Sequence, residues 1–150
     1  MIYLTIDDDY TNDIQETSVE NSASAALSHQ KTSAESDLSI VFTSDAEIQE
    51  LNKSYLGSDH PTDVLSFPAG EIDPDTGHLY MGDIIISVPQ AKSQAAAGGH
   101  TLQQEVEVLV VHGVLHLLGH DHAEEDEKAK MWQAQKEILA QCRNPLAAQF

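Results

Sequence analysis

The chain has 150 residues, a length that suits one domain with a buried core, and 41% of them are hydrophobic. Asp and Glu number 25 against 7 Lys and Arg, which gives a formal net charge of −18, and so acidic a surface repels DNA and RNA over most of its area. The longest apolar run, residues 108–111, is far shorter than the roughly 20 residues of a membrane span, and the acidic N-terminus lacks the basic start of a secretory signal, so we expect a cytoplasmic protein with no DNA or membrane partner.

In chain order, the spacing of apolar residues predicts a series of strands and helices. Alternation and β-branched residues indicate strands, and apolar residues three and four positions apart indicate helices. The predicted order is strand, helix, strand, helix, strand, strand and three helices, over residues 1–7, 12–30, 37–43, 44–55, 64–67, 79–88, 89–97, 101–118 and 123–141. Strands and helices mixed in this way predict an α+β fold, and a sequence without repeats or a linker predicts one domain over residues 1–150.

Local signals place the start of several elements. Ser44 with Glu47, and Thr101 with Gln104, form capping boxes that begin two of the helices. The first of these helices is expected to bury one apolar face, made of Ile48, Leu51 and Leu56. The strand over 64–67 has a proline on each side, and proline cannot donate a hydrogen bond to a neighbouring strand, so we expect this strand at a sheet edge.

The segment 112–122, HGVLHLLGHDH, carries the clearest chemical signal. His112 and His116 are four positions apart on the expected helix, so their rings lie on one face. Gly119 is the expected helix end, because glycine readily adopts the left-handed conformation that stops a helix, and His122 then turns back toward the same point. Three convergent imidazoles with a fourth position open are the ligand set of a catalytic zinc ion, so we predict one zinc ion per chain.

The residues between these ligands have other expected roles. We expect the ring of His120 to point outward, toward solvent or substrate, rather than toward the metal. Asp121 has two interpretations, a hydrogen bond that holds a ligand histidine and a cap on the last helix, and capping is the default. The spacing also matches the metzincin motif H-E-x-x-H-x-x-G-x-x-H, but Gly113 replaces the glutamate that serves as general base. The metal cage therefore resembles that of a protease, while the reaction is expected to differ.

Several motifs resemble the YbeY family, the bacterial rRNA maturation endoribonucleases. The segment 112–122 resembles the family signature H-G-x-L-H-L-x-G-x-D-H. Residues 59–68, DHPTDVLSFP, are similar to the family's D-x-P-T-D-V-L-S-F-P, and residues 81–86, MGDIII, to its L-G-D-I-x-I strand. Residues 51–55, LNKSY, precede these motifs as they do in the family, and the resemblance covers roughly residues 36–142.

This resemblance implies a fold, a site and an activity. The implied fold is a small mixed four-stranded sheet packed with helices, with the metal in a cleft at the histidine-bearing helix. His112, His116 and His122 are the implied zinc ligands and, through the metal, the catalytic residues. The implied activity is cleavage of single-stranded RNA in rRNA maturation, at the 3′ end of 16S rRNA, and in ribosome quality control, with rRNA and small-subunit proteins as partners. Water and the RNA 2′-hydroxyl remain alternative nucleophiles, which the product ends distinguish.

One position departs from the family pattern. The family usually has an arginine after N-x-x-Y, where this chain has Leu56. Arginine pairs two phosphate oxygens at once, and leucine cannot do so. The remaining candidates for contact with RNA are Lys53, His60 and Ser66. Leu56 and the net charge favour an alternative function, that of a ribosome-associated protein that retains its metal but has lost most of its catalytic activity. A zinc peptidase that binds its substrate peptide as an added strand at the sheet edge is the less favoured alternative.

Overall fold

The structure is a computed structural model that describes residues 1–150. It confirms the α+β fold, and the strands and longer helices follow the predicted order. Two short 3-10 helices, η1 and η2, were not predicted. The elements are β1 (Ile2–Ile6), η1 (Asp8–Tyr10), α1 (Glu16–His29), β2 (Ser36–Thr43), α2 (Asp45–Leu56), β3 (Val64–Ile72), β4 (Leu79–Ser87), α3 (Val88–Gly98), α4 (Leu102–Leu117), α5 (Glu125–Gln141) and η2 (Pro145–Gln149). None of these helices combines the length and the apolar character that a membrane crossing requires.

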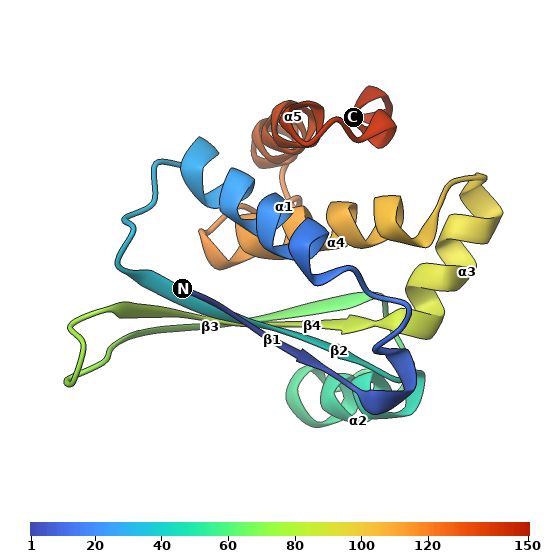
Figure 1. Ribbon diagram of the computed structural model, residues 1–150, viewed down its shortest axis with the longest axis horizontal. Coiled ribbons are helices and arrows are strands. Elements are labelled where there is room, and N and C mark those ends of the chain that lie inside the picture. Colours follow the sequence, from blue (N-terminus) through green and yellow to red (C-terminus); the bar gives the residue numbers. More distant parts are fainter.

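The four strands form one mixed sheet in the order β1-β2-β4-β3. β1 and β4 both run parallel to β2, while β3 is antiparallel to β4. β3 therefore lies at an edge of the sheet, as the prolines predicted. In Figure 1, α1 and α4 cover one face of the sheet, α5 lies outside them as a further layer, and α2 covers part of the opposite face.

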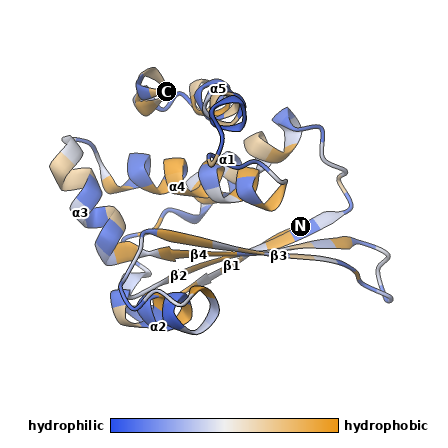
Figure 2. Ribbon diagram, turned by 180° about the vertical axis from the view of Figure 1, so that it is seen from behind, coloured by the Kyte–Doolittle hydropathy of each residue, from blue (hydrophilic) through white to orange (hydrophobic).

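The main hydrophobic core fills the space between the sheet and the helices α1 and α4. Figure 2 shows apolar residues concentrated along α4 and the strands, whereas α5 is apolar on one side only. Leu38, Ile40 and Phe42 of β2 are completely buried here, as are Val110 and Val114 of α4. Each such side chain contributes about 1.5–3 kcal/mol through its burial. A smaller cluster under α2 consists of Ile48, Leu65 and Ile85.

Two glycines allow α4 and β3 to approach β4 closely. A Cβ atom added at Gly113 of α4 would lie 2.7 Å from Ile84 Cγ2, a distance that real side chains do not tolerate. Gly82 of β4 has φ of 142°, and a Cβ there would overlap the carbonyl oxygen of Phe67 on β3. The helix that bears the histidines is therefore set directly on the strand that neighbours the sheet edge.

The structure extends β3 well beyond the predicted segment 64–67. The strand continues to Ile72 and pairs with β4 through Pro68, with a shift of register between Pro68 and Glu71. Proline is tolerated because β3 is an edge strand, in which one side of the backbone has no ladder partner. The prolines thus predicted the position of the strand in the sheet correctly but not its length.

The predicted burial of Leu56 is wrong, because this side chain is 62% exposed. Helical spacing places Leu56 on the same face as Ile48 and Asn52, and Ile48 is buried as predicted. Asn52 is also buried, and its side-chain amide donates a hydrogen bond to the carbonyl oxygen of His60. The loop after α2 therefore folds back beneath this face, and the last turn of the helix is left in solvent.

Candidate metal centre

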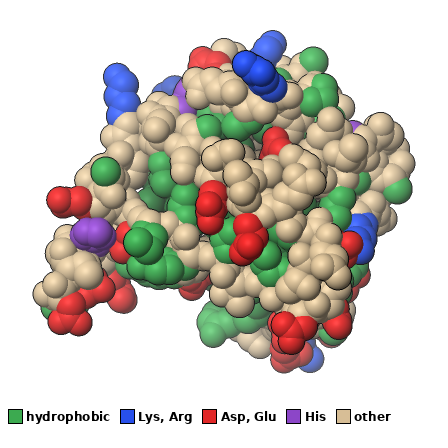
Figure 3. Space-filling model, in the orientation of Figure 1, with side chains coloured by type: hydrophobic (Ala, Val, Ile, Leu, Met, Phe, Trp, Pro, Cys, Tyr) green, Lys and Arg blue, Asp and Glu red, His purple; other side chains and the backbone are tan.

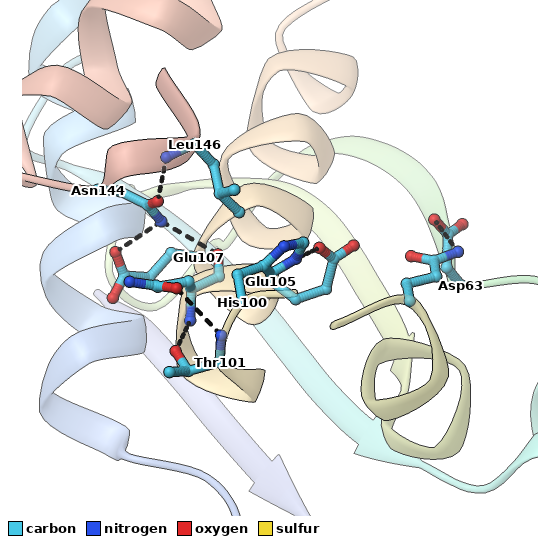
Figure 4. A network of polar contacts seen from close by, with 9 residues as sticks. Asp63, His100, Thr101, Glu105, Glu107, Asn144 and Leu146 are labelled. Atoms are coloured by element: carbon cyan, nitrogen blue, oxygen red, sulfur yellow. Dashed lines mark hydrogen bonds and ion pairs between the residues drawn. The ribbon is translucent and has the colours of Figure 1, made fainter. Parts of the chain in front are cut away.

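The three histidines of the candidate metal centre come from the end of α4 and the turn that follows it. α4 begins with the predicted capping box. The side chain of Thr101 accepts a hydrogen bond from the backbone N–H of Gln104, and the side chain of Gln104 accepts one from the backbone N–H of Thr101 (Figure 4). The helix ends as predicted at Gly119, which has φ of 94°. The backbone N–H of Gly119 donates to the carbonyl of His116, and that of His120 donates to the carbonyl of Leu115. These bonds reverse the chain within one turn and bring the residues after Gly119 back beside the helix.

Polar contacts secure the first turns of α4 against the rest of the molecule. His100 and Glu105 form a hydrogen bond with 2.6 Å between His Nε2 and the carboxylate. The side-chain amide of Asn144 donates to the buried carboxylate of Glu107, at 3.2 Å, and to the carbonyl of Gln104. Figure 4 shows that these contacts join α4 to the segment after α5. The N-terminal half of α4 is thus held in place, and this fixes the position of the histidines toward its C-terminal end.

Ring nitrogens of His112, His116 and His122 converge on one point. One nitrogen from each ring lies within 4.8 Å of the other two. The Nε2 atoms of His112 and His116 are 2.9 Å apart. Two neutral imidazoles do not bring bare lone pairs this close without a proton or a cation between them. In a tetrahedral zinc site, Zn–N bonds of about 2.0–2.1 Å place ligand nitrogens roughly 3.3 Å apart. The donor set and its spacing therefore fit a metal ion.

The surroundings favour the neutral, metal-binding form of two of these rings. Burial lowers the pKa of His112 below its ordinary value, and the neighbouring His116 lowers it further. Burial likewise lowers the pKa of His116, with an added effect of His122. Protonated imidazole cannot bind a metal, so each of these shifts widens the pH range in which the site is competent.

His120 and Asp121 lie in the turn but take no part in the cluster. The ring of His120 faces α1, where its Nε2 atom is 2.7 Å from the side-chain oxygen of Gln30. The carboxylate of Asp121 accepts a hydrogen bond from the backbone N–H of His122, at 2.7 Å. The N-cap of α5 is Glu124, without a side-chain cap bond, so the predicted capping role of Asp121 is wrong. Asp121 instead stabilises the turn that carries His122.

The histidines line one wall of a cleft of about 400 Å³. The opposite wall is the loop before β3 together with the start of this strand. The lining residues are Thr62, Asp63, Val64, Leu65, Ser66, Pro68, His112, His116 and His122. They include no Lys or Arg. On the face drawn in Figure 3, acidic side chains are scattered widely, and Lys and Arg lie mainly toward its margins. A bound metal ion would therefore be the main positive charge in the cleft.

Of the residues predicted to contact RNA, the structure places only Ser66 in this cleft. Its hydroxyl donates to the carbonyl of Gly113 at 3.3 Å and so ties β3 to α4. Lys53 is exposed on α2 and does not line the cleft. His60 is exposed in the loop after α2, with its ring against the carbonyl of Pro61. Leu56, at the end of α2, also lies outside the lining.

Sequence reasoning missed two residues of the site, Asp63 and Gln135. Asp63 lines the cleft, where its carboxylate accepts hydrogen bonds from the backbone of Val64 and from the side chain of Gln94. The sequence signal for Asp63 is its place directly before the predicted strand over 64–67, within the segment 59–68. Gln135 is 1% exposed and lies 3.1 Å from Nδ1 of His112. No local pattern marks it, because α5 packs on α4 only in the folded chain.

Comparison with known proteins gives consistent matches over most of the chain. The model of the family Endoribonuclease YbeY matches residues 5–143. The Endoribonuclease YbeY of Halalkalibacterium halodurans is 49% identical over 111 residues, covering 69% of this chain and 70% of that protein. The protein of the same name from Geobacillus kaustophilus is 40% identical over 144 residues, covering 88% and 91%. A Thermotoga maritima protein solved in solution is 25% identical, with a TM-score of 0.59 over 99% of this chain and 95% of that one. The matched residues include the whole candidate metal centre.

Proposed function

The chain belongs to the YbeY endoribonuclease family, and from this membership we propose that it is a zinc-dependent endoribonuclease specific for single-stranded RNA. The proposed role is rRNA maturation in the cytoplasm, at the 3′ end of 16S rRNA, together with ribosome quality control. The proposed partners are rRNA and proteins of the small ribosomal subunit. The observation that supports this function best is the convergence of three histidines in a cleft beside an edge strand.

The residues of the cleft suggest a division of roles. We assign His112, His116 and His122 to one zinc ion, which when bound supplies a Lewis acid for the oxygens of a phosphodiester. Thr62 and Ser66 line the cleft, where their hydroxyls donate to Asp63 and to the carbonyl of Gly113 and keep lone pairs that can accept a hydrogen bond from a ribose hydroxyl. Asp63 is the only carboxylate in the lining, and a carboxylate can accept the proton of an attacking hydroxyl. In this assignment, Asp63 supplies the base that Gly113 cannot.

A second candidate function is an rRNA-binding or ribosome-binding protein with weakened catalysis. Its support is the exposure of Leu56 at the family's arginine position and a cleft lining without Lys or Arg. Each missing charged hydrogen bond to a phosphate removes about 1.5–3 kcal/mol of stabilisation. The third candidate, a zinc peptidase, loses support from the packing of Gly113 against Ile84, which leaves no room for a glutamate side chain.

The test is cleavage of a labelled RNA in single-stranded and duplex form, with metal content measured by mass spectrometry on the same samples. We expect cleavage of the single strand, one zinc ion per chain, and loss of both in His112→Ala, His116→Ala and His122→Ala. His120→Ala is the matched control and should keep its metal. Cyclic phosphate ends would identify the 2′-hydroxyl as nucleophile, and 5′-phosphate ends would identify water.

Two results would redirect the assignment. Cleavage that persists in His116→Ala after the metal is gone would remove the histidines from catalysis. A wild-type protein that holds zinc and binds RNA but cleaves neither form would favour the second candidate function.

Casein serves as the substrate for the peptidase alternative, and no turnover is expected.

A further inference from the structure

The buried side chain of Gln135 faces the back of the first histidine of the metal centre. Its side-chain oxygen lies 3.1 Å from Nδ1 of His112. Gln135 comes from α5, 23 positions later in the chain, and its side chain is 1% exposed. Figure 1 shows α5 as the outer layer over α1 and α4. A helix that otherwise covers the core thus sends one polar side chain inward to the site.

The contact determines which nitrogen of His112 can bind a metal. The Nε2 atom faces the convergence point, 2.9 Å from Nε2 of His116. A neutral imidazole that offers a lone pair at Nε2 carries its proton at Nδ1, and a buried N–H requires an acceptor. The side-chain oxygen of Gln135 is that acceptor. The hydrogen bond therefore selects the tautomer and fixes the plane of the ring.

The other two rings lack a side-chain acceptor of this kind. The ring of His116 has a hydrogen bond with the backbone of His120, and His122 is exposed and is held through its backbone by Asp121. Gln135 is thus the one buried side chain that orients a ring of the cluster. Groups in this position are frequently carboxylates or backbone carbonyls, which make the imidazole more basic. An amide is a weaker, uncharged acceptor.

We propose that Gln135 is a positioning residue that holds His112 in its metal-binding tautomer while adding no negative charge behind the metal. This inference rests on the proposed metal centre. Its physical advantage follows from the cleft, whose lining has Asp63 and no Lys or Arg. In a chain with a net charge of −18, a further carboxylate close to the metal would cancel part of the charge that attracts a phosphate. A neutral amide gives the orientation without that loss.

The test compares Gln135→Met, which keeps the length of the side chain but removes the acceptor, with Gln135→Glu, which makes the acceptor a carboxylate. Gln133→Met is the matched control, because Gln133 is exposed on the same helix and its side chain hydrogen-bonds to Glu137, away from the three histidines of the site. Zinc affinity is measured by competition with a chromophoric chelator. The visible spectrum of the Co²⁺-substituted protein reports the ligand geometry, and thermal unfolding of the metal-free proteins reports stability.

We expect Gln135→Met to lower zinc affinity by about 10- to 100-fold and to change the Co²⁺ spectrum. Gln135→Glu should bind zinc about tenfold more tightly than wild type, because the acceptor is stronger and charged. The metal-loaded Glu variant should also bind inorganic phosphate more weakly. Gln133→Met should match wild type in every measurement.

The inference and the proposed metal centre fail in different ways. If the wild-type protein binds no zinc or Co²⁺, the metal centre fails and the role of Gln135 fails with it. If the wild type binds zinc and Gln135→Met binds within threefold of it with the same Co²⁺ spectrum, only the inference about Gln135 is overturned. Should the Met variant not fold, an unchanged zinc affinity and Co²⁺ spectrum in Gln135→Glu would overturn the inference equally.

Discussion

Gly113 follows the first histidine of the cluster, and the lack of a side chain there has two consequences. The backbone of α4 can lie against Ile84 of the sheet, where an added Cβ atom would come within 2.7 Å of a methyl group. A glutamate at this position would require α4 to move off the sheet. The catalytic base of a zinc peptidase is therefore excluded by packing as well as by sequence, and the one carboxylate in the cleft lining comes from Asp63 on the opposite wall.

Leu56 allows a gain of function to be tested at a single position. Its side chain is 62% exposed, so an arginine can be introduced without steric cost. We expect Leu56→Arg to speed single-turnover cleavage of single-stranded RNA by roughly one to two orders of magnitude, because a charged hydrogen bond contributes about 1.5–3 kcal/mol and 1.36 kcal/mol is a factor of ten in rate. Ser54→Arg, at a nearby exposed position of the same helix, controls for added charge alone. An equal gain in both variants, or a gain in neither from an active parent, would contradict a position-specific role.

The pKa directions of His112 and His116 predict how acid affects metal binding. Burial lowers both pKa values, so protons begin to compete with the metal only below the pH of about 6.5 at which ordinary histidines titrate. Zinc affinity should be nearly constant at higher pH and should fall below that value. A synthetic peptide of residues 112–122, whose histidines are exposed, should lose affinity at a higher pH than the protein does. A protein that loses zinc at the same pH as the peptide would show that the folded environment does not shift these groups.

At the scale of elements, signals within one turn were more reliable than contacts between distant elements. The predicted capping box of Ser44 and Glu47 formed in one direction only, because the carboxylate of Glu47 accepts a hydrogen bond from Thr43 instead. The capping box of Thr101 and Gln104 and the helix end at Gly119 formed as predicted, because both depend on backbone geometry within one turn. The burial of Leu56 and the cap at Asp121 were wrong, because a returning loop and a short turn took over those positions. Gln135 could not have been found, since it reaches His112 only through the packing of α5 on α4.

The turn at Gly119 links backbone conformation to the metal centre. Gly119→Ala places a side chain at φ of 94°, which costs roughly 1–2 kcal/mol for a residue with a Cβ atom. Gly77→Ala is the matched control, because Gly77 has φ of 74° in the turn between β3 and β4 and also has open space around it. We expect both variants to lose similar stability in denaturant unfolding, and only Gly119→Ala to lose zinc affinity. Equal zinc affinity in the two would mean that the turn does not position His122.

At the scale of the whole molecule, the net charge of −18 repels RNA, whereas a metal ion bound in the cleft would attract it. The acidic surface repels RNA from every side, and ions screen that repulsion over about 10 Å at 0.1 M salt. The cleft attracts RNA only when it holds a cation, because its lining contains no Lys or Arg. Recognition of RNA is therefore expected to be local and to depend on the metal.

This balance predicts an unusual response to salt. Each phosphate neutralised on a single strand contributes a slope of about −0.7 to the dependence of log affinity on log salt. With few basic contacts, the slope for this protein should be shallower than about −1, and relief of the general repulsion can even reverse its sign. Fluorescence anisotropy of a labelled single-stranded RNA across a potassium chloride series measures the slope, with zinc-free His116→Ala as control. A slope as steep as about −3 would reveal a basic surface that this structure does not contain.

All three rings of the metal centre lie within the eleven residues of segment 112–122, whereas the support for His112 arrives from α5. During synthesis this segment leaves the ribosome before residues 125–141, and closing so short a loop around an ion loses little chain entropy. A nascent chain can therefore gather its rings on an ion early, while the exchange of that ion with the surroundings is still fast. Docking of α5 then brings Gln135 against His112, so we expect this later helix to determine how slowly an ion held by the three rings would exchange.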